Sequence, residues 1–233
     1  MGVIGEGLVQ ALKMLVTGDP EVWDITLRTL QISGLATVIS VLLGVPVGVV
    51  LGLKRFAGRG FAATLVNFGM GLPPVIVGLV TWLCFTRYGP LGFLGLLYTP
   101  TAMVTAQAII AFPLVAGFTM AAIQSLNPRL GLQILALGAD RLQYLWLILR
   151  EARLGLLAAV IAGFGGVISE VGASMMVGGN VKGLTRVLTT AIALEVSKGR
   201  FELATALSVI LLLLSFAITA LLTALQQHRR QPQ

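Results

Sequence analysis

The sequence predicts an all-α integral membrane protein with about five transmembrane helices and a further helix at its N-terminus. Of its 233 residues, 57% are hydrophobic and only 11% are charged, against about 45–50% and about 25% in soluble domains. Five apolar windows are also long enough to cross a hydrocarbon core, which takes about 20 residues. They lie between Arg28 and Lys54, Arg59 and Arg87, Arg87 and Arg129, Arg153 and Lys182, and from Leu203 to Leu225. A membrane β-barrel would show short alternating strands instead.

The first 20 residues precede these windows and end in the Gly18-Asp19-Pro20 break. Glu6 and Lys13 interrupt the apolar core that a cleavable signal peptide needs, so we expect the mature protein to keep this segment. Its apolar residues recur at helical spacing, which predicts an extracytoplasmic interfacial helix within residues 1–20; a soluble amphipathic cap is the alternative. Residues 21–228 form the predicted transmembrane domain, and residues 229–233 form a polar tail.

Basic residues near helix ends favour the cytoplasm. With five spans, three basic clusters fall on one side of the membrane: Lys54, Arg55 and Arg59, the arginines within residues 129–153, and Arg229 with Arg230. This predicts an N-terminus outside and a C-terminus in the cytoplasm. The formal charge of +7 does not indicate nucleic-acid binding, because the basic residues are spread singly among helix ends without an aromatic platform.

Glycine and proline residues within the windows predict a packed and kinked bundle. Glycines at every fourth position let two membrane helices approach closely, and an internal proline removes a helical hydrogen bond that neighbouring groups must replace. The alternative is that both residue types are simply commoner in membrane helices. The positions concerned are Gly44, Gly48, Gly52, Pro46, Pro73, Pro74 and Pro113.

Residues 125–153 form the longest polar stretch inside the chain. We expect a short helix over Leu130–Leu137 that ends at Gly138, followed by a second helical run over Leu142–Ala152. A short exposed helix held between two membrane helices can dock a partner protein. Alternatively, it is an amphipathic connector that rests on lipid headgroups.

Motifs for catalysis are missing from the sequence. It contains no phosphate-binding loop of the Gly-x-x-x-x-Gly-Lys-Ser/Thr type, no His-Glu-x-x-His and no Gly-x-Ser-x-Gly elbow. One cysteine, Cys84, and one histidine, His228, cannot supply the usual ligands of a metal. We therefore expect a chain that is not an enzyme and that binds no metal or cofactor itself.

Two polar features remain as functional candidates. Glu170 is the only ionisable residue between Arg153 and Lys182, and charges at that depth usually face a bundle interior or a wet cavity. It either lines a path or only fixes helix packing. The glycine-rich segment 178–186 carries Lys182 and Arg186, and such segments can attract an oxyanion through backbone N–H groups or form an ordinary turn.

Three stretches resemble a known family. Residues 132–140 (Leu-Gln-Ile-Leu-Ala-Leu-Gly-Ala-Asp), continuing into 149–156, resemble the cytoplasmic loop of permease subunits of ATP-binding cassette (ABC) importers, although the usual Glu-Ala-Ala start is replaced. Ser169-Glu-Val-Gly-Ala173 is similar to a segment of molybdate and sulfate permeases. Asn180-Val-Lys-Gly-Leu-Thr-Arg186 resembles the Asn-Ile-Pro-Gly-x-Thr segment of the same permeases, with Lys182 in place of proline, and the longer stretch 178–195 is most similar to tungstate-type permeases.

The resemblance implies a type I importer permease fold in the inner membrane of a prokaryote, and import of an oxyanion, most simply tungstate. Molybdate, sulfate or another anion, a secondary transporter and a non-transport scaffold stay as alternatives. The implied partners are a second copy of the chain, two ATPase subunits that bind ATP and Mg, an extracytoplasmic oxyanion-binding protein and membrane lipid. The implied coupling residues are Leu135, Leu137, Gly138, Ala139, Asp140 and Arg141. Our candidate pathway or gate residues are Glu170, Gly172, Ser174, Asn180, Lys182, Thr185 and Arg186.

Overall fold

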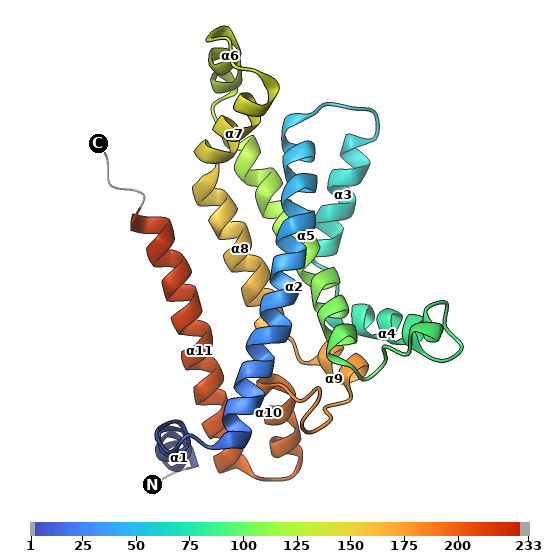
Figure 1. Ribbon diagram of the computed structural model, residues 1–233, viewed down its shortest axis with the longest axis vertical. Coiled ribbons are helices and arrows are strands. Elements are labelled where there is room, and N and C mark those ends of the chain that lie inside the picture. Colours follow the sequence, from blue (N-terminus) through green and yellow to red (C-terminus); the bar gives the residue numbers. More distant parts are fainter. Residues whose placement is uncertain (1–2, 229–233) are drawn as a thin grey trace.

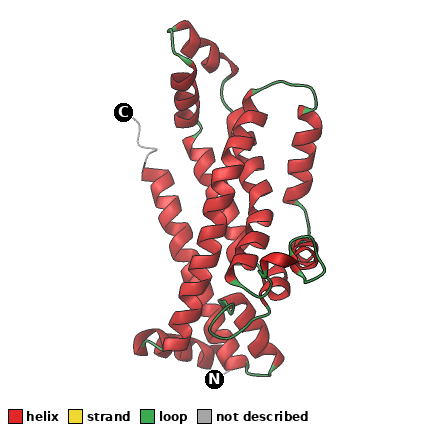
Figure 2. Cartoon of the chain, turned by 45° about the vertical axis from the view of Figure 1, so that its right-hand side comes forward, coloured by secondary structure: helices red, strands yellow, loops and turns green. Residues whose placement is uncertain are grey.

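The computed structural model describes residues 3–228 (Figure 1), and the regular elements within that range are all helical (Figure 2). Three helices are long and apolar enough to cross a membrane as single helices. They are α2 (Pro20–Leu53), α5 (Pro100–Gln124) and α11 (Phe201–His228), the last over Phe201–Ala224. The predicted all-helical membrane fold is therefore confirmed, and three of its windows are single helices.

The other two apolar windows are broken helices. Between Arg59 and Arg87 the chain forms α3 (Arg59–Met70) and α4 (Pro74–Phe85), which meet at 100°. The break lies at Pro73 and Pro74, because proline has no N–H to donate and drives the residue before it into extended backbone. The fourth window forms α8 (Arg153–Ile168) and α9 (Gly172–Gly178), bent by 59°. If each pair is one span, the described chain has five.

The break at residues 18–20 separates α1 (Val3–Thr17) from α2. Gly18 has a φ of +67°, which only glycine adopts readily, and the Asp19 carboxylate accepts hydrogen bonds from the N–H groups of Glu21 (2.9 Å) and Val22. This is a standard start for a helix, with proline at its first position. Helix α1 then packs across the N-terminal end of α11 (Figures 1 and 2). Its place at the membrane interface stays a prediction.

The most extensive helix pairing is between α2 and α5. Three glycines at four-residue spacing turn one face of α2 towards α5. A Cβ atom at Gly44 would lie 3.1 Å from the Ala116 nitrogen, and one at Gly48 would lie 2.5 Å from the Ala116 carbonyl oxygen. At Gly52 it would lie 2.7 Å from the Ile123 Cβ atom. The two backbones can approach this closely only because these side chains are missing.

Two prolines lie within continuous helices rather than at breaks. Pro46 is inside α2 and Pro113 is inside α5. Pro113 is buried, and Gly69 of α3 packs against its ring, where a Cβ atom at position 69 would be 2.8 Å from the proline Cβ. Pro113 therefore contributes to the contact between α5 and α3.

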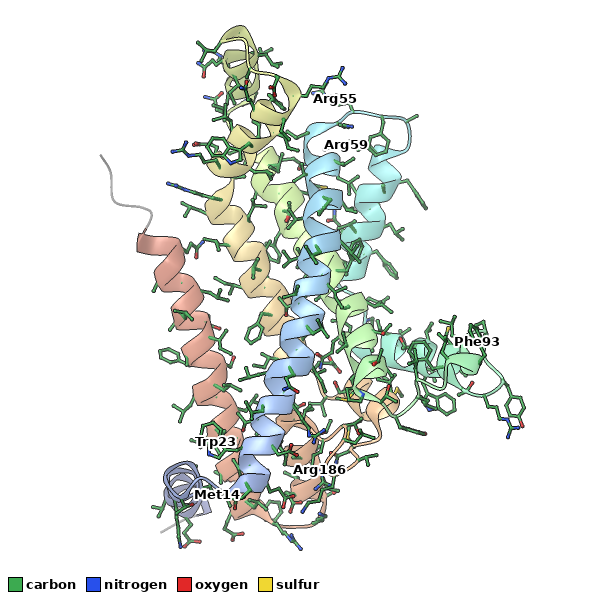
Figure 3. The ribbon with its side chains drawn as sticks, in the orientation of Figure 1. Met14, Trp23, Arg55, Arg59, Phe93 and Arg186 are labelled. Atoms are coloured by element: carbon green, nitrogen blue, oxygen red, sulfur yellow. The ribbon has the colours of Figure 1, made fainter. Side chains whose placement is uncertain are left out.

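The remaining elements lie at the two ends of the bundle (Figure 1). Helices α6 (Pro128–Ala136) and α7 (Arg141–Glu151) lie at the end that also carries the loop between α2 and α3, where Figure 3 shows Arg55 and Arg59. The opposite end carries α1 and α10 (Leu188–Ser197), with Met14, Trp23 and Arg186. Helix α4 and the 3-10 helix η1 (Gly92–Leu94) project sideways, with Phe93 near their tip. The first described residues and the end of α11 thus lie at opposite ends.

The α2–α5 contact predicts a matched pair of glycine substitutions. Gly48→Ala places a methyl group against backbone, so we expect a loss of stability of about 1–3 kcal/mol from overpacking. Gly34→Ala, in the same helix, meets nothing within 4 Å and should leave stability unchanged or slightly raise it. Thermal unfolding in detergent measures both. Equal unfolding temperatures would contradict the close contact.

Candidate functional site

Glu170 lies in the break between α8 and α9 and is buried, with 8% of its surface exposed. Its Oε1 atom accepts a hydrogen bond from the Ala173 N–H (2.8 Å), and its backbone carbonyl accepts one from the Thr189 hydroxyl (2.9 Å). The carboxylate thereby satisfies an N–H of the first turn of α9 that has no partner within the helix. These contacts give the packing interpretation a physical basis. Whether the side chain also lines a path stays a prediction.

Next to this break, Ser174 of α9 joins Gln107 of α5. The Gln107 Nε2 atom donates to the Ser174 hydroxyl (3.1 Å), and both side chains are almost fully buried. The Gln107 Oε1 atom has no hydrogen-bond partner among the described residues, and neither has the buried hydroxyl of Thr81 on α4. Our sequence prediction did not include Gln107, because an uncharged amide inside an apolar window carries no distinctive pattern. Gly172 lies close by, where a Cβ atom would be 3.0 Å from Val75.

The segment 178–186 folds over the start of α2. Glu21 pairs with both predicted cations: its carboxylate lies 2.7 Å from the Lys182 Nζ atom and 3.6 Å from an Arg186 nitrogen. Arg28 donates to the Leu184 carbonyl (2.9 Å), which ties the segment to α2 a second time. The two cations thus share one carboxylate, which lowers the positive charge that they can offer to an oxyanion. Glu21 was not among the predicted site residues.

Internal hydrogen bonds hold the same segment in shape. Asn180 has a φ of +51°, and its side-chain amide donates to the Thr190 carbonyl (3.2 Å). The buried Thr185 hydroxyl donates to the Gly178 carbonyl and accepts from the Val181 N–H (2.9 Å). Asn180 and Thr185 therefore stabilise a defined turn beside α9 and α10.

A cavity of about 410 Å³ opens beside this segment, between α2, α10 and α11. Its lining combines apolar and charged side chains. The buried Glu195 carboxylate lies 2.9 Å from the Lys198 Nζ atom and 3.6 Å from an Arg200 nitrogen, which repeats the pairing of one acid with two cations seen at Glu21. The charged lining residues are Asp19, Glu21, Glu195, Lys182, Arg186, Lys198 and Arg200.

The predicted coupling residues form the turn between α6 and α7 at the other end of the bundle (Figure 1). Gly138 has a φ of +82°, a conformation that favours glycine, and Asp140 starts α7 with a capping box to Gln143. Leu135 and Leu137 expose 55% and 87% of their surfaces. The remaining members of the set are the half-buried Ala139 and the exposed Arg141. The helix boundaries thus agree with the predicted stop at Gly138.

The candidate residues therefore form two groups rather than one site. The residues between 170 and 186 gather around α9 and α10, whereas those between 135 and 141 lie at the opposite end (Figure 1). Among the described residues, no three His, Cys, Asp or Glu side chains come together as metal ligands would. The arrangement offers one packed polar region and one exposed apolar turn, joined by α5 and α8.

Comparison with known proteins identifies the family. Residues 44–231 match the model of the binding-protein-dependent transport system inner membrane component family. The chain belongs to this family and is a multi-pass permease component of the inner membrane. The resemblance to ABC importer permeases is thereby confirmed.

Individual relatives narrow the similarity further. The chain is 43% identical to the tungstate uptake system permease protein TupB of Peptoclostridium acidaminophilum, over 98% of this chain and 100% of that protein. It is 40% identical to a probable anion ABC transporter permease protein of Haloferax volcanii, over 85% of this chain and 88% of that protein. In fold, it matches a chain of the inward-facing MetNI methionine ABC transporter with a TM-score of 0.73 and 22% identity. The match covers 91% of this chain and 95% of that chain.

The contacts of Glu170 predict different effects for two substitutions. Glu170→Ala removes the acceptor for the Ala173 N–H, and we expect a loss of about 0.5–2 kcal/mol, as for other helix caps. Glu170→Gln keeps a side-chain oxygen in place and should unfold close to the wild-type temperature. Glu202→Ala, at an exposed position in the first turn of α11, is the control. If the Gln variant unfolds as early as the Ala variant, the cap is not what the side chain contributes.

Proposed function

We propose that this chain is the membrane-spanning subunit of an ATP-driven importer that carries tungstate into the cytoplasm. The observation that supports this most strongly is the 43% identity, over 98% of this chain and 100% of the relative, with a permease named for tungstate uptake. The similarity to a probable anion permease supports the same substrate class. Molybdate and sulfate are also tetrahedral oxyanions, and they are the competing substrates in the test below.

In this proposal, ATP is bound and hydrolysed on two partner ATPase subunits that dock at the α6–α7 turn. Leu135 and Leu137 expose large apolar surfaces there, and exposed apolar patches commonly mark protein contacts. The loop between α2 and α3 lies at the same end and carries Lys54 and Arg55, and Arg59 begins α3 directly after it. Cationic loops favour the cytoplasm, so we place the C-terminus inside and α1 outside.

Two copies of the chain, with a binding protein at the outer end, complete the proposed importer. When the ATPase subunits close, the α6–α7 turn moves as a rigid unit and α5 and α8 carry the motion across the membrane, as in other helix-shift transitions. The polar region around Glu170, Ser174 and the segment 180–186 lies at the outer ends of these helices. It is the part of the chain we assign to the path or its gate.

Transport in reconstituted vesicles tests this function directly. We expect the permease, its ATPase and its binding protein together to accumulate tungstate only when ATP is present, with molybdate and sulfate competing more weakly. Uptake that runs on an ion gradient without ATP would instead indicate a secondary transporter. A chain that never copurifies with an ATPase would indicate a scaffold.

The coupling role of the α6–α7 turn has its own test. Gly138→Val forces a β-branched residue into left-handed backbone, which costs about 1–2 kcal/mol locally, so we expect the transport-coupled ATPase rate to fall to its basal level. Gly58→Val creates the same strain at a φ of +87° in the loop before α3 and should leave coupling intact. ATP hydrolysis by the assembled complex measures both variants, after membrane insertion has been checked. Unchanged coupling in the Gly138 variant would contradict this role.

A further inference from the structure

A cluster of cationic and aromatic side chains lies where α7 meets α8, and the transport role described above does not use it. Trp146, Leu149, Arg150 and Arg153 line a cavity of about 450 Å³. The Arg150 guanidinium lies 5.2 Å from the centre of the Trp146 ring, a cation–π distance. Trp146 itself exposes 57% of its surface. The spacing of four residues on α7 places Trp146 and Arg150 on one face of the helix.

Stacking on the tryptophan orients the Arg150 side chain without using its N–H donors. Within the described part of the chain, no ion pair involves Arg150. No carboxylate lines the cavity either, since Glu151 lies on α7 but is not among the lining residues. The cavity is therefore lined by two arginines and no carboxylate, and stacking on Trp146 holds the guanidinium of Arg150 in place.

A contact with the last transmembrane helix shows how deep the cavity lies. The Gln226 Nε2 atom donates to the Leu154 carbonyl (3.0 Å), and in the sequence Gln226 directly follows the apolar window that ends at Leu225 and begins a polar run. Leu154 therefore lies at the level where α11 leaves the hydrocarbon, and Arg153 is its neighbour in sequence. Trp146, Arg150 and Arg153 are thus at headgroup level, which is where tryptophan concentrates in membrane proteins.

We propose that this cavity binds the headgroup of an anionic phospholipid, of the phosphatidylglycerol type. A guanidinium presents parallel N–H donors that match a phosphate, and basic pockets beside transmembrane helices commonly hold anionic headgroups. The exposed turn at Leu135–Arg141 lies farther out along α6 and α7 (Figure 1).

Binding there would fix the base of α7 at the membrane surface. Helix α7 connects the α6–α7 turn to α8, so a bound headgroup gives the moving turn a defined pivot. Only the assignment of this end to the cytoplasmic leaflet rests on the proposed function. The binding itself does not, because it can be measured in a bilayer that contains the same lipid on both faces.

Native mass spectrometry of the purified full-length permease, titrated with phosphatidylglycerol or phosphatidylcholine, tests the site. We expect retention of phosphatidylglycerol to exceed that of phosphatidylcholine by about fivefold for each arginine in contact. The preference should disappear in the double variant Arg150→Gln with Arg153→Gln. It should persist in Arg129→Gln, which removes an exposed arginine from α6 at the same end. An equal preference in the double variant and the wild type would overturn the proposal.

Fluorescence locates the lipid independently. The chain has three tryptophans, so Trp23→Phe with Trp82→Phe leaves Trp146 alone, and lipids brominated near the headgroup should quench it more strongly as phosphatidylglycerol than as phosphatidylcholine. Equal quenching by the two lipids would overturn the proposal. Loss of the phosphatidylglycerol effect in millimolar inorganic phosphate would also overturn it, because the site would then bind soluble phosphate. Loss of the effect when the ATPase binds would overturn it as well, because the site would then be a protein contact. Tungstate uptake by the same variants is a separate measurement, so failure of the lipid site and failure of the proposed function are distinguishable.

Discussion

The close contact between the backbones of α2 and α5 is the constraint on which the rest of the bundle depends. Gly44, Gly48 and Gly52 remove the side chains that would keep the two helices apart, and in lipid such packing replaces the hydrophobic effect as the main attraction between helices. With α5 held there, its other faces are free to receive α3, α8 and α9. The positions of both broken helices therefore follow from one pair of unbroken ones.

Each break in a membrane helix exposes backbone groups that lipid cannot satisfy, and the structure meets this requirement with local polar contacts. At the α8–α9 break the Glu170 carboxylate accepts from an N–H of α9, and its carbonyl accepts from Thr189 of α10. Beyond α9, the hydroxyl of Thr185 and the amide of Asn180 hold the following turn. The polar residues that stand out in the sequence are thus the groups that make irregular backbone tolerable at this depth.

Much of the fold could be predicted from the sequence because membrane spans depend on apolar length, and helix ends depend on local signals such as Gly138 and Asp19. The angles between the helices at the two breaks could not be predicted. Pro73 and Pro74 mark where one helix ends, but they do not fix the direction of the next helix. Candidate residues at the end that carries α9 and α10 were found only in part. Lys182 and Arg186 carry a visible charge pattern, whereas their partner Glu21 lies about 160 positions away, and only the folded chain brings them together. Gln107 carries no charge, and its role depends on burial that no local pattern shows.

The length of α2 has a mechanical consequence. Its 34 residues give a rod of about 51 Å at 1.5 Å per residue, whereas the hydrocarbon core is about 30 Å thick. At one end of α2, Glu21 forms an ion pair and Arg28 a hydrogen bond with the segment 178–186. At the other end, the Leu51 carbonyl accepts a hydrogen bond from Arg59. Helix α2 alone therefore links the segment 178–186 at one end of the bundle to the start of α3 at the other. If one end of α2 tilts, the other end must move too. The size of that movement depends on the length of α2 on each side of its contact with α5.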